Sequence, residues 1–312
     1  MRNKSDRGRF ASKDGFLVAT PGLIWGASFL FIAEGLKATG PNAIAFVRLL
    51  IGLATLAMFP AARKPIERST WPAIALVGGL WFAFPLSMFP LAEQRVSSAL
   101  TGMLNAAVPL FTAIVATAIA GRIPDRRVIV GLTVGLVGAG LVAFPTLHEG
   151  HSSVDGVLLI LAAVISYGFA LNIARPLQQR YGALPVILRA QTVAVMLTAP
   201  LGLRDLVASH WTPASLVSLV LLGAFGTGAA FVLLAMAAGR VGATRASSTA
   251  FLIPPVALLL GVTVRGEHVA AISICGSAVC VAGAWCMRRT QIEPQGDNQP
   301  SQTLLAAQRC ES

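Results

Sequence analysis

Charged side chains are scarce in this chain. Asp, Glu, Lys and Arg together make up only 12% of its 312 residues, whereas 55% are hydrophobic and the mean hydropathy is +0.73. An average soluble protein carries roughly 25% charged residues. The composition therefore excludes an ordinary soluble domain and indicates an integral membrane protein.

Cysteine and histidine are also few, and their spacing is not typical of catalysis or metal binding. Cys275, Cys280 and Cys286 lie five and six positions apart, which is neither a CxxC pair nor a set on one helix face. His148 and His151 have no further ligand nearby. No cluster of acids or Ser/His partners converges within the apolar stretches. We therefore expect no metal, no cofactor, no catalytic residue and no enzyme.

Long uncharged stretches recur along the whole chain, and about 20 apolar residues are enough to cross the hydrocarbon core of a bilayer. Outside them remain the basic N-terminus, 1–15, and a polar tail, 289–312, with the composition of a disordered segment. The sequence predicts an all-α integral membrane protein with ten transmembrane helices, at about 16–36, 42–59, 71–91, 97–120, 127–145, 154–174, 185–203, 214–237, 243–264 and 269–287.

The most informative pattern is an internal repeat without gaps. Residues 96–141 are similar to residues 241–286, and the shift of 145 positions places Pro109 on Pro254. If each half holds an odd number of spans, the second half enters the membrane upside down, as in many secondary transporters. We therefore predict two inverted five-helix repeats, 16–145 and 154–288.

Basic residues favour one side of the predicted membrane. The two termini and alternate connections carry 18 Lys and Arg, whereas the opposite connections carry only Lys37, Arg95, Arg204 and Arg265. The positive-inside rule then predicts that both termini are cytoplasmic. The net charge of +11 faces an anionic leaflet in this arrangement, so it requires no nucleic-acid partner.

Prolines and aromatic residues within the spans are candidates for a substrate cavity. Pro109 and Pro254 each remove intrahelical hydrogen bonds near the middle of a span, and interrupted helices at matching places in inverted halves point to a substrate site. A purely structural kink is the alternative. Trp25 and Tyr167 each precede a glycine, which suits either helix packing or a cavity wall. The full set of candidates is Trp25, Ser28, Phe29, Arg48, Trp81, Asn105, Pro109, Tyr167, Asn172, Phe251, Pro254 and Pro255.

Arg48 is an ionised group seven residues inside the second predicted span. A charge at the centre of a span costs about 2.5–3.5 kcal/mol on insertion scales, so a role is expected. The side chain could reach the interface, join helices or bind an anionic substrate group. Glu34, Glu93 and Glu267 lie at span ends, and no carboxylate proton relay is predicted.

Four segments resemble a known family. They read IWGASFLFIAEGL, GPNAIAFVRLLIGLATL, NAAVPLFTAIVA and VGATRASSTAFLIPPVALLLGVTVRGE. Together they look like the most recognisable parts of the drug/metabolite transporter superfamily, in its ten-helix EamA branch with two EamA repeats. The resemblance covers about 16–288. It implies a bacterial inner-membrane carrier that exports small metabolites such as amino acids, with a cavity formed by the first, third, fourth, sixth, eighth and ninth spans.

The resemblance also assigns individual residues. Arg122 stands where the family often has a glutamate after the fourth span, which weakens the case for a symmetric acidic pair and leaves the fold unaffected. The family's motif positions fall on Trp25, Gly26, Arg48, Pro109, Pro254 and Glu267.

The main hypothesis is a secondary transporter that exports an amino acid or related compound by alternating access. A drug or toxic-compound efflux carrier and a membrane-embedded enzyme are the alternatives. A channel would require a ring of like side chains or a carbonyl filter, and the sequence offers neither. The expected partners are a small-molecule substrate and the lipid bilayer. The oligomeric state is left open, with a monomer as one option.

Overall fold

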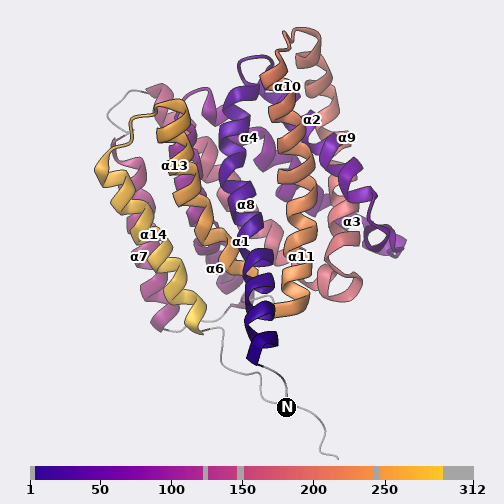
Figure 1. Cartoon of the computed structure of the whole chain (residues 1–312), viewed down its shortest axis with the longest axis vertical. Coiled ribbons are helices and arrows are strands. Elements are labelled where there is room, and N and C mark those ends of the chain that lie inside the picture. Colours follow the sequence, from indigo (N-terminus) through magenta and orange to yellow (C-terminus); the bar gives the residue numbers. More distant parts are fainter. Residues whose placement is uncertain (1–3, 122–125, 146–150, 242–245, 291–312) are drawn as a thin grey trace, which may run out of the picture.

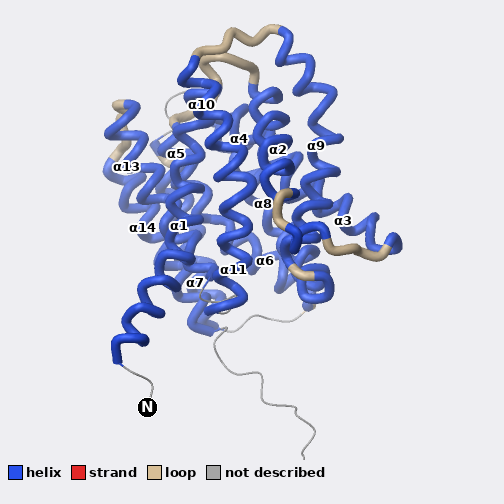
Figure 2. The backbone as a smooth tube through the Cα atoms, turned by 45° about the vertical axis from the view of Figure 1, so that its right-hand side comes forward, coloured by secondary structure: helices blue, strands red, loops and turns tan. Residues whose placement is uncertain are grey.

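The structure, a computed structural model, describes residues 4–121, 126–145, 151–241 and 246–290, and this part of the chain consists of helices without a strand (Figures 1 and 2). Arg122, His148 and the tail beyond Thr290 lie outside the described residues. The helices are α1 (Lys4–Gly35), α2 (Pro41–Ala57), η1 (Pro60–Arg63), η2 (Arg68–Thr70), α3 (Trp71–Val77), η3 (Gly78–Ala83), α4 (Phe84–Glu93), α5 (Ser98–Leu104), η4 (Asn105–Ala107), α6 (Val108–Ala120), α7 (Arg126–Ala143), α8 (His151–Tyr181), α9 (Ala183–Val207), α10 (Pro213–Leu221), η6 (Leu222–Ala229), α11 (Ala230–Val241), η7 (Ser247–Leu252), α13 (Ile253–Arg265) and α14 (Ala271–Thr290).

Several helical stretches have the length and composition to cross a membrane. Within the described residues six qualify: Asp14–Gly35, Arg68–Glu93, Ser98–Ala120, Ser153–Tyr181, Ala183–Val207 and Pro213–Arg240. Shorter apolar helices lie beside them in the same bundle (Figure 1), at Pro41–Ala57, Val128–Ala143, Thr249–Arg265 and Ala271–Cys286. The chain is a multi-pass membrane protein.

One end of the bundle, which we call the distal end, lies opposite the N-terminus of α1 (Figure 1). It contains the connections 36–40, 94–97, 208–212 and 266–270. Two of these connections are joined directly, because the backbone N–H of His210 donates to the carbonyl of Ala38 at 2.8 Å.

The helices that contain the repeated prolines are interrupted, as the sequence predicts. Pro109 lies in the first turn of α6 and Pro254 in the first turn of α13, and each helix directly follows a 3-10 stretch, η4 or η7. Proline is tolerated in a first turn because its missing N–H would have no helical partner there. Both helices end at a glycine in the left-handed region, Gly121 with φ 60° and Gly266 with φ 65°. Each proline therefore begins a new helical segment.

Two π-helical stretches form a second matched pair, which the sequence analysis did not predict. They are η3 in the stretch Arg68–Glu93 and η6 in the stretch Pro213–Arg240. The shift of 145 positions that relates the prolines carries Gly78 onto Gly223, so the two stretches occupy corresponding places. Single-turn π-helical insertions are rare and are frequent at functional sites.

The two π-helical stretches pack reciprocally on helices from the other half of the chain. A Cβ added to Gly78 would lie 2.6 Å from the carbonyl oxygen of Ala190 in α9. A Cβ added to Gly223 would lie 2.6 Å from Cβ of Ile51 in α2. Neither site has room for a side chain, so glycine is required for this close approach. The first half thus packs η3 on α9, and the second half packs η6 on α2.

Helices α7 and α14 form a close pair at one edge of the bundle (Figure 1). A Cβ on Gly276 would lie 2.8 Å from the carbonyl oxygen of Gly138, and a Cβ on Gly283 would lie 2.6 Å from that of Gly131. Small residues on facing helices allow such backbone contact in membranes.

Candidate functional site

Side chains of two other helices donate hydrogen bonds to the π-helical stretch η6. Nε1 of Trp25 in α1 donates to the carbonyl of Gly226 at 2.9 Å, and Nε2 of Gln191 in α9 donates to that of Thr227 at 2.8 Å. A π-helical stretch disturbs the regular helical ladder, and backbone groups within a membrane must find partners inside the protein. These donors therefore hold η6 against α1 and α9.

The other π-helical stretch is held in a similar way. The hydroxyl of Ser166 in α8 donates to the carbonyl of Leu80 in η3 at 2.7 Å. Ser166 directly precedes Tyr167, the residue that the sequence analysis matched with Trp25. In each half, the first span-length helix thus donates a side-chain hydrogen bond to the π-helical stretch of the other half, from Trp25 or from the residue beside its counterpart Tyr167.

Arg48 lies in the interior of the bundle, with only 4% of its surface exposed. Its Nε donates to the hydroxyl of Thr227 at 3.1 Å, and that hydroxyl donates to the carbonyl of Leu222 at 3.2 Å. Within the described part of the chain, no other hydrogen bond or ion pair of the guanidinium is present. The side chain lies inside the bundle and not on its surface, and its terminal nitrogens remain available for an anionic group.

Ser28 lies next to this arginine. A Cβ added to Gly226 would be 2.9 Å from Oγ of Ser28 and 4.0 Å from Nη2 of Arg48. Ser28 is buried and donates to the carbonyl of Ile24 in its own helix at 3.0 Å. Ser28, Arg48 and the hydroxyl of Thr227 therefore gather around the middle of η6.

Aromatic rings of α1, η3 and α11 meet beside this polar group. The ring of Phe231 contacts Trp25 at 5.3 Å between centroids and Trp81 at 5.9 Å, both edge to face. Trp81 stacks on Phe82 at 5.2 Å. The structure therefore brings the candidates Trp25 and Trp81 together through Phe231, which the sequence analysis did not select.

A second aromatic group lies between α1, α4 and α8. The ring of Phe89 is 5.7 Å from that of Phe29 and 6.0 Å from that of Tyr167. Tyr167 is also close enough to Arg48 for electrostatic interaction. The candidates Phe29 and Tyr167 thus share one neighbour, and Tyr167 lies near the arginine.

The two candidate asparagines have different environments. Nδ2 of Asn172 donates to the carbonyls of Thr112 at 3.0 Å and Gly168 at 2.8 Å, and so ties α8 to α6. Asn105 lies in η4, just before the segment that Pro109 begins, and its Oδ1 is buried without a hydrogen-bond partner among the described residues.

The remaining candidates lie around the start of α13. Pro254 is buried, whereas Pro255 is exposed on the surface of the bundle and does not join the interior group. Phe251 packs against the main hydrophobic core. A Cβ on Gly26, next to Trp25, would lie 2.5 Å from Cβ of Val256, so α1 and α13 are in close contact here.

Glu267 fixes the start of α5 at the distal end. Its Oε1 accepts from the backbone N–H and hydroxyl of Ser98 at 3.1 and 2.7 Å and from Nε of Arg265 at 3.0 Å, and its Oε2 accepts from the backbone N–H of Ala99 at 2.9 Å. Burial alone would raise the pKa of this carboxyl, but the hydrogen bonds from Ser98, Ala99 and Arg265 outweigh burial and hold the pKa below its usual value.

Glu93, the last residue of α4, has a different environment at the same end. Both of its carboxyl oxygens are enclosed and accept no hydrogen bond from the described residues. The sequence places this residue beside a short loop, which is a typical position for a solvated acid. Its enclosure arises from tertiary packing, and the neighbouring residues in the sequence do not indicate it.

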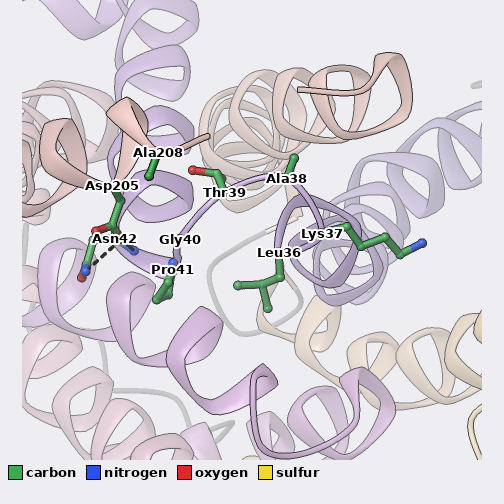
Figure 3. Close-up of a pocket in the computed structure, with 9 residues that line it drawn as sticks. All are labelled: Leu36, Lys37, Ala38, Thr39, Gly40, Pro41, Asn42, Asp205 and Ala208. Atoms are coloured by element: carbon green, nitrogen blue, oxygen red, sulfur yellow. Dashed lines mark hydrogen bonds between the residues drawn. The ribbon is translucent and has the colours of Figure 1, made fainter. Parts of the chain in front are cut away.

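A surface depression of about 420 Å³ opens between the α1–α2 connection and the end of α9 (Figure 3). In it, Oδ2 of Asp205 accepts from the backbone N–H and from Nδ2 of Asn42, both at 3.1 Å. The depression is lined by Leu36, Lys37, Ala38, Thr39, Gly40, Pro41, Asn42, Asp205 and Ala208, none of which is a sequence candidate.

Two participants in the interior group were missed by sequence reasoning, Thr227 and Phe231. Gln191 had a signal in the sequence, since an uncharged amide within an apolar stretch either bridges helices or lines a wet cavity. Gly223 had one too, because it repeats Gly78 at the shift of 145 positions.

Comparison with known proteins identifies relatives over most of the chain. The model of the EamA-like transporter family matches residues 15–144 and again residues 154–289. The uncharacterized transporter YdfC of Bacillus subtilis (strain 168) is 28% identical over 266 residues, which cover 83% of this chain and 86% of that protein.

A probable terminal-alkyne amino-acid exporter of Streptantibioticus cattleyicolor is 26% identical over 270 residues, which cover 85% of this chain and 90% of that protein. One crystal structure resembles the fold with a TM-score of 0.60 and 18% sequence identity, over 90% of this chain and 99% of that one. This last similarity concerns the fold alone.

Proposed function

The chain belongs to the EamA-like transporter family, and we propose that it exports a small metabolite, an amino acid or a related compound, across the bacterial inner membrane by alternating access. We base this proposal above all on the enclosed guanidinium of Arg48, which has one hydrogen bond to Thr227 and lies among aromatic side chains. Charged groups within membrane bundles commonly mark a substrate path.

We further propose that ten helices cross the membrane as two inverted five-helix repeats. Helix α2, with 17 residues, and the stretch Thr249–Arg265 rise about 25 Å at 1.5 Å per residue, which is close to the thickness of a thin hydrocarbon core. The reciprocal packing of η3 on α9 and of η6 on α2 is the arrangement expected from a two-fold relation between the halves.

We propose that the distal end faces the outside of the cell and that both termini are cytoplasmic. The distal connections contain Lys37 and Arg95, with Arg204 and Arg265 near the ends of α9 and α13, and the opposite side carries most of the basic residues. This distribution follows the positive-inside rule.

In this proposal Arg48 binds an anionic group of the substrate, such as a carboxylate. Its planar guanidinium can donate two parallel hydrogen bonds to a carboxylate while Nε keeps its bond to Thr227. The rings of Trp25, Trp81 and Phe29 provide apolar surface nearby. A carboxylate-bearing compound with an apolar part fits this combination, and an amino-acid exporter is among the relatives.

Flux into inverted membrane vesicles tests the proposal. The host expressing the chain is first challenged with amino acids, analogues and toxic metabolites, and the compounds whose toxicity it relieves are then offered in radiolabelled form to the vesicles. We expect saturable uptake without chemical change of the compound. Linear uptake would indicate a channel, and product formation would indicate an enzyme; either result would rule out the carrier.

A further inference from the structure

Glu93 is a carboxyl group that the proposed export site does not use. Both of its oxygens are enclosed at the end of α4 and accept no hydrogen bond from the described residues. Enclosing an ionised carboxylate without donors costs far more free energy than enclosing the neutral acid, because the charge loses its hydration and gains no partner. Its environment therefore favours the protonated form.

Glu93 has both negative and positive groups nearby. Glu267 repels a negative charge at this position, whereas Arg265 and Arg48 attract it, and none of the described basic residues forms an ion pair with it. On the other elements packed against α4, the titratable or charged groups towards this end are Glu34 of α1, paired with Lys37, and Asp155 and Tyr167 of α8.

The repulsion from Glu267 is a fixed feature of the distal end as the structure shows it. Glu267 receives four hydrogen bonds, from Ser98, Ala99 and Arg265, and these stabilise its ionised form. Arg265 is already paired with Glu267 at 3.0 Å, and Arg48, whose Nε donates to Thr227, forms no ion pair with Glu93. An ionised Glu93 would therefore be repelled by Glu267 without a paired cation of its own.

We propose that Glu93 is a proton-binding site, which takes up one proton from water at the distal end when this end closes and returns it when this end opens. The inference rests on the proposed function for its place in the transport cycle. With the distal end outside, the empty carrier takes up an external proton as it closes, so an acidic exterior favours closure. An ionised Glu93 needs water, and water reaches it when the distal end is open.

A thiol at position 101 reports this opening without any transported compound. Thr101 is fully buried in α5, and its hydroxyl donates only within its own helix, to the carbonyl of Ser97. Thr101→Cys is introduced after replacement of Cys275, Cys280, Cys286 and Cys310, and the full chain is reconstituted in lipid nanodiscs. The rate of reaction with a water-soluble methanethiosulfonate reagent is measured from pH 5 to pH 9, with Glu93 and with Glu93→Gln.

The rate with Glu93 is divided by the rate with Glu93→Gln, and this ratio cancels the pH dependence of the thiol itself. We expect the ratio to be near one in acid. It should rise by up to about tenfold for each unit of increasing pH, because closure binds one proton in the protein with Glu93 and none in the Gln variant. A ratio that stays constant over the whole pH range would overturn the proposal. Glu34→Gln is the matched control, an acid near the same end that is already paired with Lys37, and it should keep the pH profile of the unsubstituted protein.

Glu93→Met guards against a folding defect, since a neutral enclosed carboxyl without partners can be replaced by an apolar side chain of similar volume. If both Glu93→Gln and Glu93→Met fail to accumulate in the membrane, an ionised Glu93 supports the fold and the proposal is wrong. Saturable flux with a flat ratio would contradict the proton site alone. A pH-dependent ratio in a chain that transports none of the tested compounds would contradict the proposed function alone.

Discussion

Nε1 of Trp25 and the carbonyl of Gly226 are joined at 2.9 Å although they lie 201 positions apart in the chain. The bond connects α1 to the π-helical stretch η6, beside the position where Ser28 and Arg48 meet. It adds a bond between helices to those that η6 forms within its own segment. Trp25 therefore combines this structural bond with a ring that packs edge to face against Phe231.

Trp25→Phe keeps a ring against Phe231 but removes the donor to Gly226. We expect a loss of stability of about 0.5–1.5 kcal/mol, the net contribution of one hydrogen bond, together with slower flux. Thermal unfolding in detergent and vesicle flux measure the two effects. The matched control is Trp71→Phe at the exposed start of α3, which should change neither. Unchanged unfolding in Trp25→Phe would mean that another donor replaces the indole.

Arg48→Ala should reduce export strongly, and Arg48→Lys should restore it only in part. A charge-assisted hydrogen bond contributes about 1.5–3 kcal/mol, so we expect the apparent affinity to fall about tenfold or more in the Ala variant. Lys keeps the charge and loses the planar fork, so its maximal rate should be preserved with weaker affinity.

Membrane abundance separates the two roles of Arg48. If the arginine only joins α2 to η6 through Thr227, abundance and flux should fall in parallel in both variants, without a change of affinity. Full activity in Arg48→Ala would remove this residue from the site.

Pro109→Ala and Pro254→Ala should impair flux more than abundance. Alanine restores an N–H at the start of α6 or α13, which favours a continuous helix over the 3-10 interruption. The exposed neighbour Pro255 is the control, and Pro255→Ala should transport normally. Normal flux in both buried-proline variants at normal abundance would show that the interruptions are dispensable.

Cysteines at positions 37 and 126 test the proposed topology. In a cysteine-free background, Lys37→Cys should react with an impermeant thiol reagent added to intact cells, whereas Arg126→Cys should react only after permeabilisation. Both positions are exposed at opposite ends of the bundle. The reverse labelling pattern would invert the topology and place the distal end in the cytoplasm.

Glu267→Gln should lower the melting temperature at neutral pH, and the difference from the unsubstituted chain should shrink in acid. The pKa of Glu267 is lower in the folded state than its usual value, so its carboxylate stabilises the fold above pH about 4.3. This contribution is lost as the pH falls below that value through the folded pKa. Melting curves at pH 7 and pH 3.5 measure it, with Glu34→Gln as the control. An equal difference at both pH values would contradict the role of the charge.

The parts of the fold that were predictable depend on local chemistry. Pro109 and Pro254 each lack the N–H that would continue a helix from the preceding turn, and Gly121 and Gly266 suit the left-handed ends of the same segments, so the repeat in the sequence reappears as repeated backbone geometry. Hydrophobic length likewise located the span-length helices. Helix α1 begins at Lys4, before the predicted span at about 16–36, because charged residues limit the membrane-spanning part of a helix but do not end the helix itself.

The parts that were not predictable depend on contacts between distant segments. No local residue pattern specifies the π-helical stretches; their carbonyl partners, Gln191 and Ser166, come from other helices. Arg48 was expected inside a span, but its bond to Thr227 depends on how α2 meets η6. Glu93 is enclosed for the same kind of reason.

The reciprocal packing of η3 on α9 and of η6 on α2 also sets an order of events during synthesis. When the ribosome has completed the first five predicted spans, Gly78 in η3 still lacks the helix that will cover it, and α2 still lacks η6. These surfaces must remain in lipid, or be covered by an insertion factor, until α9 and η6 have been made. The N-terminal half released on its own would therefore expose two unfilled helix interfaces to the bilayer, and quality-control proteases that survey membrane helices would meet it in that state.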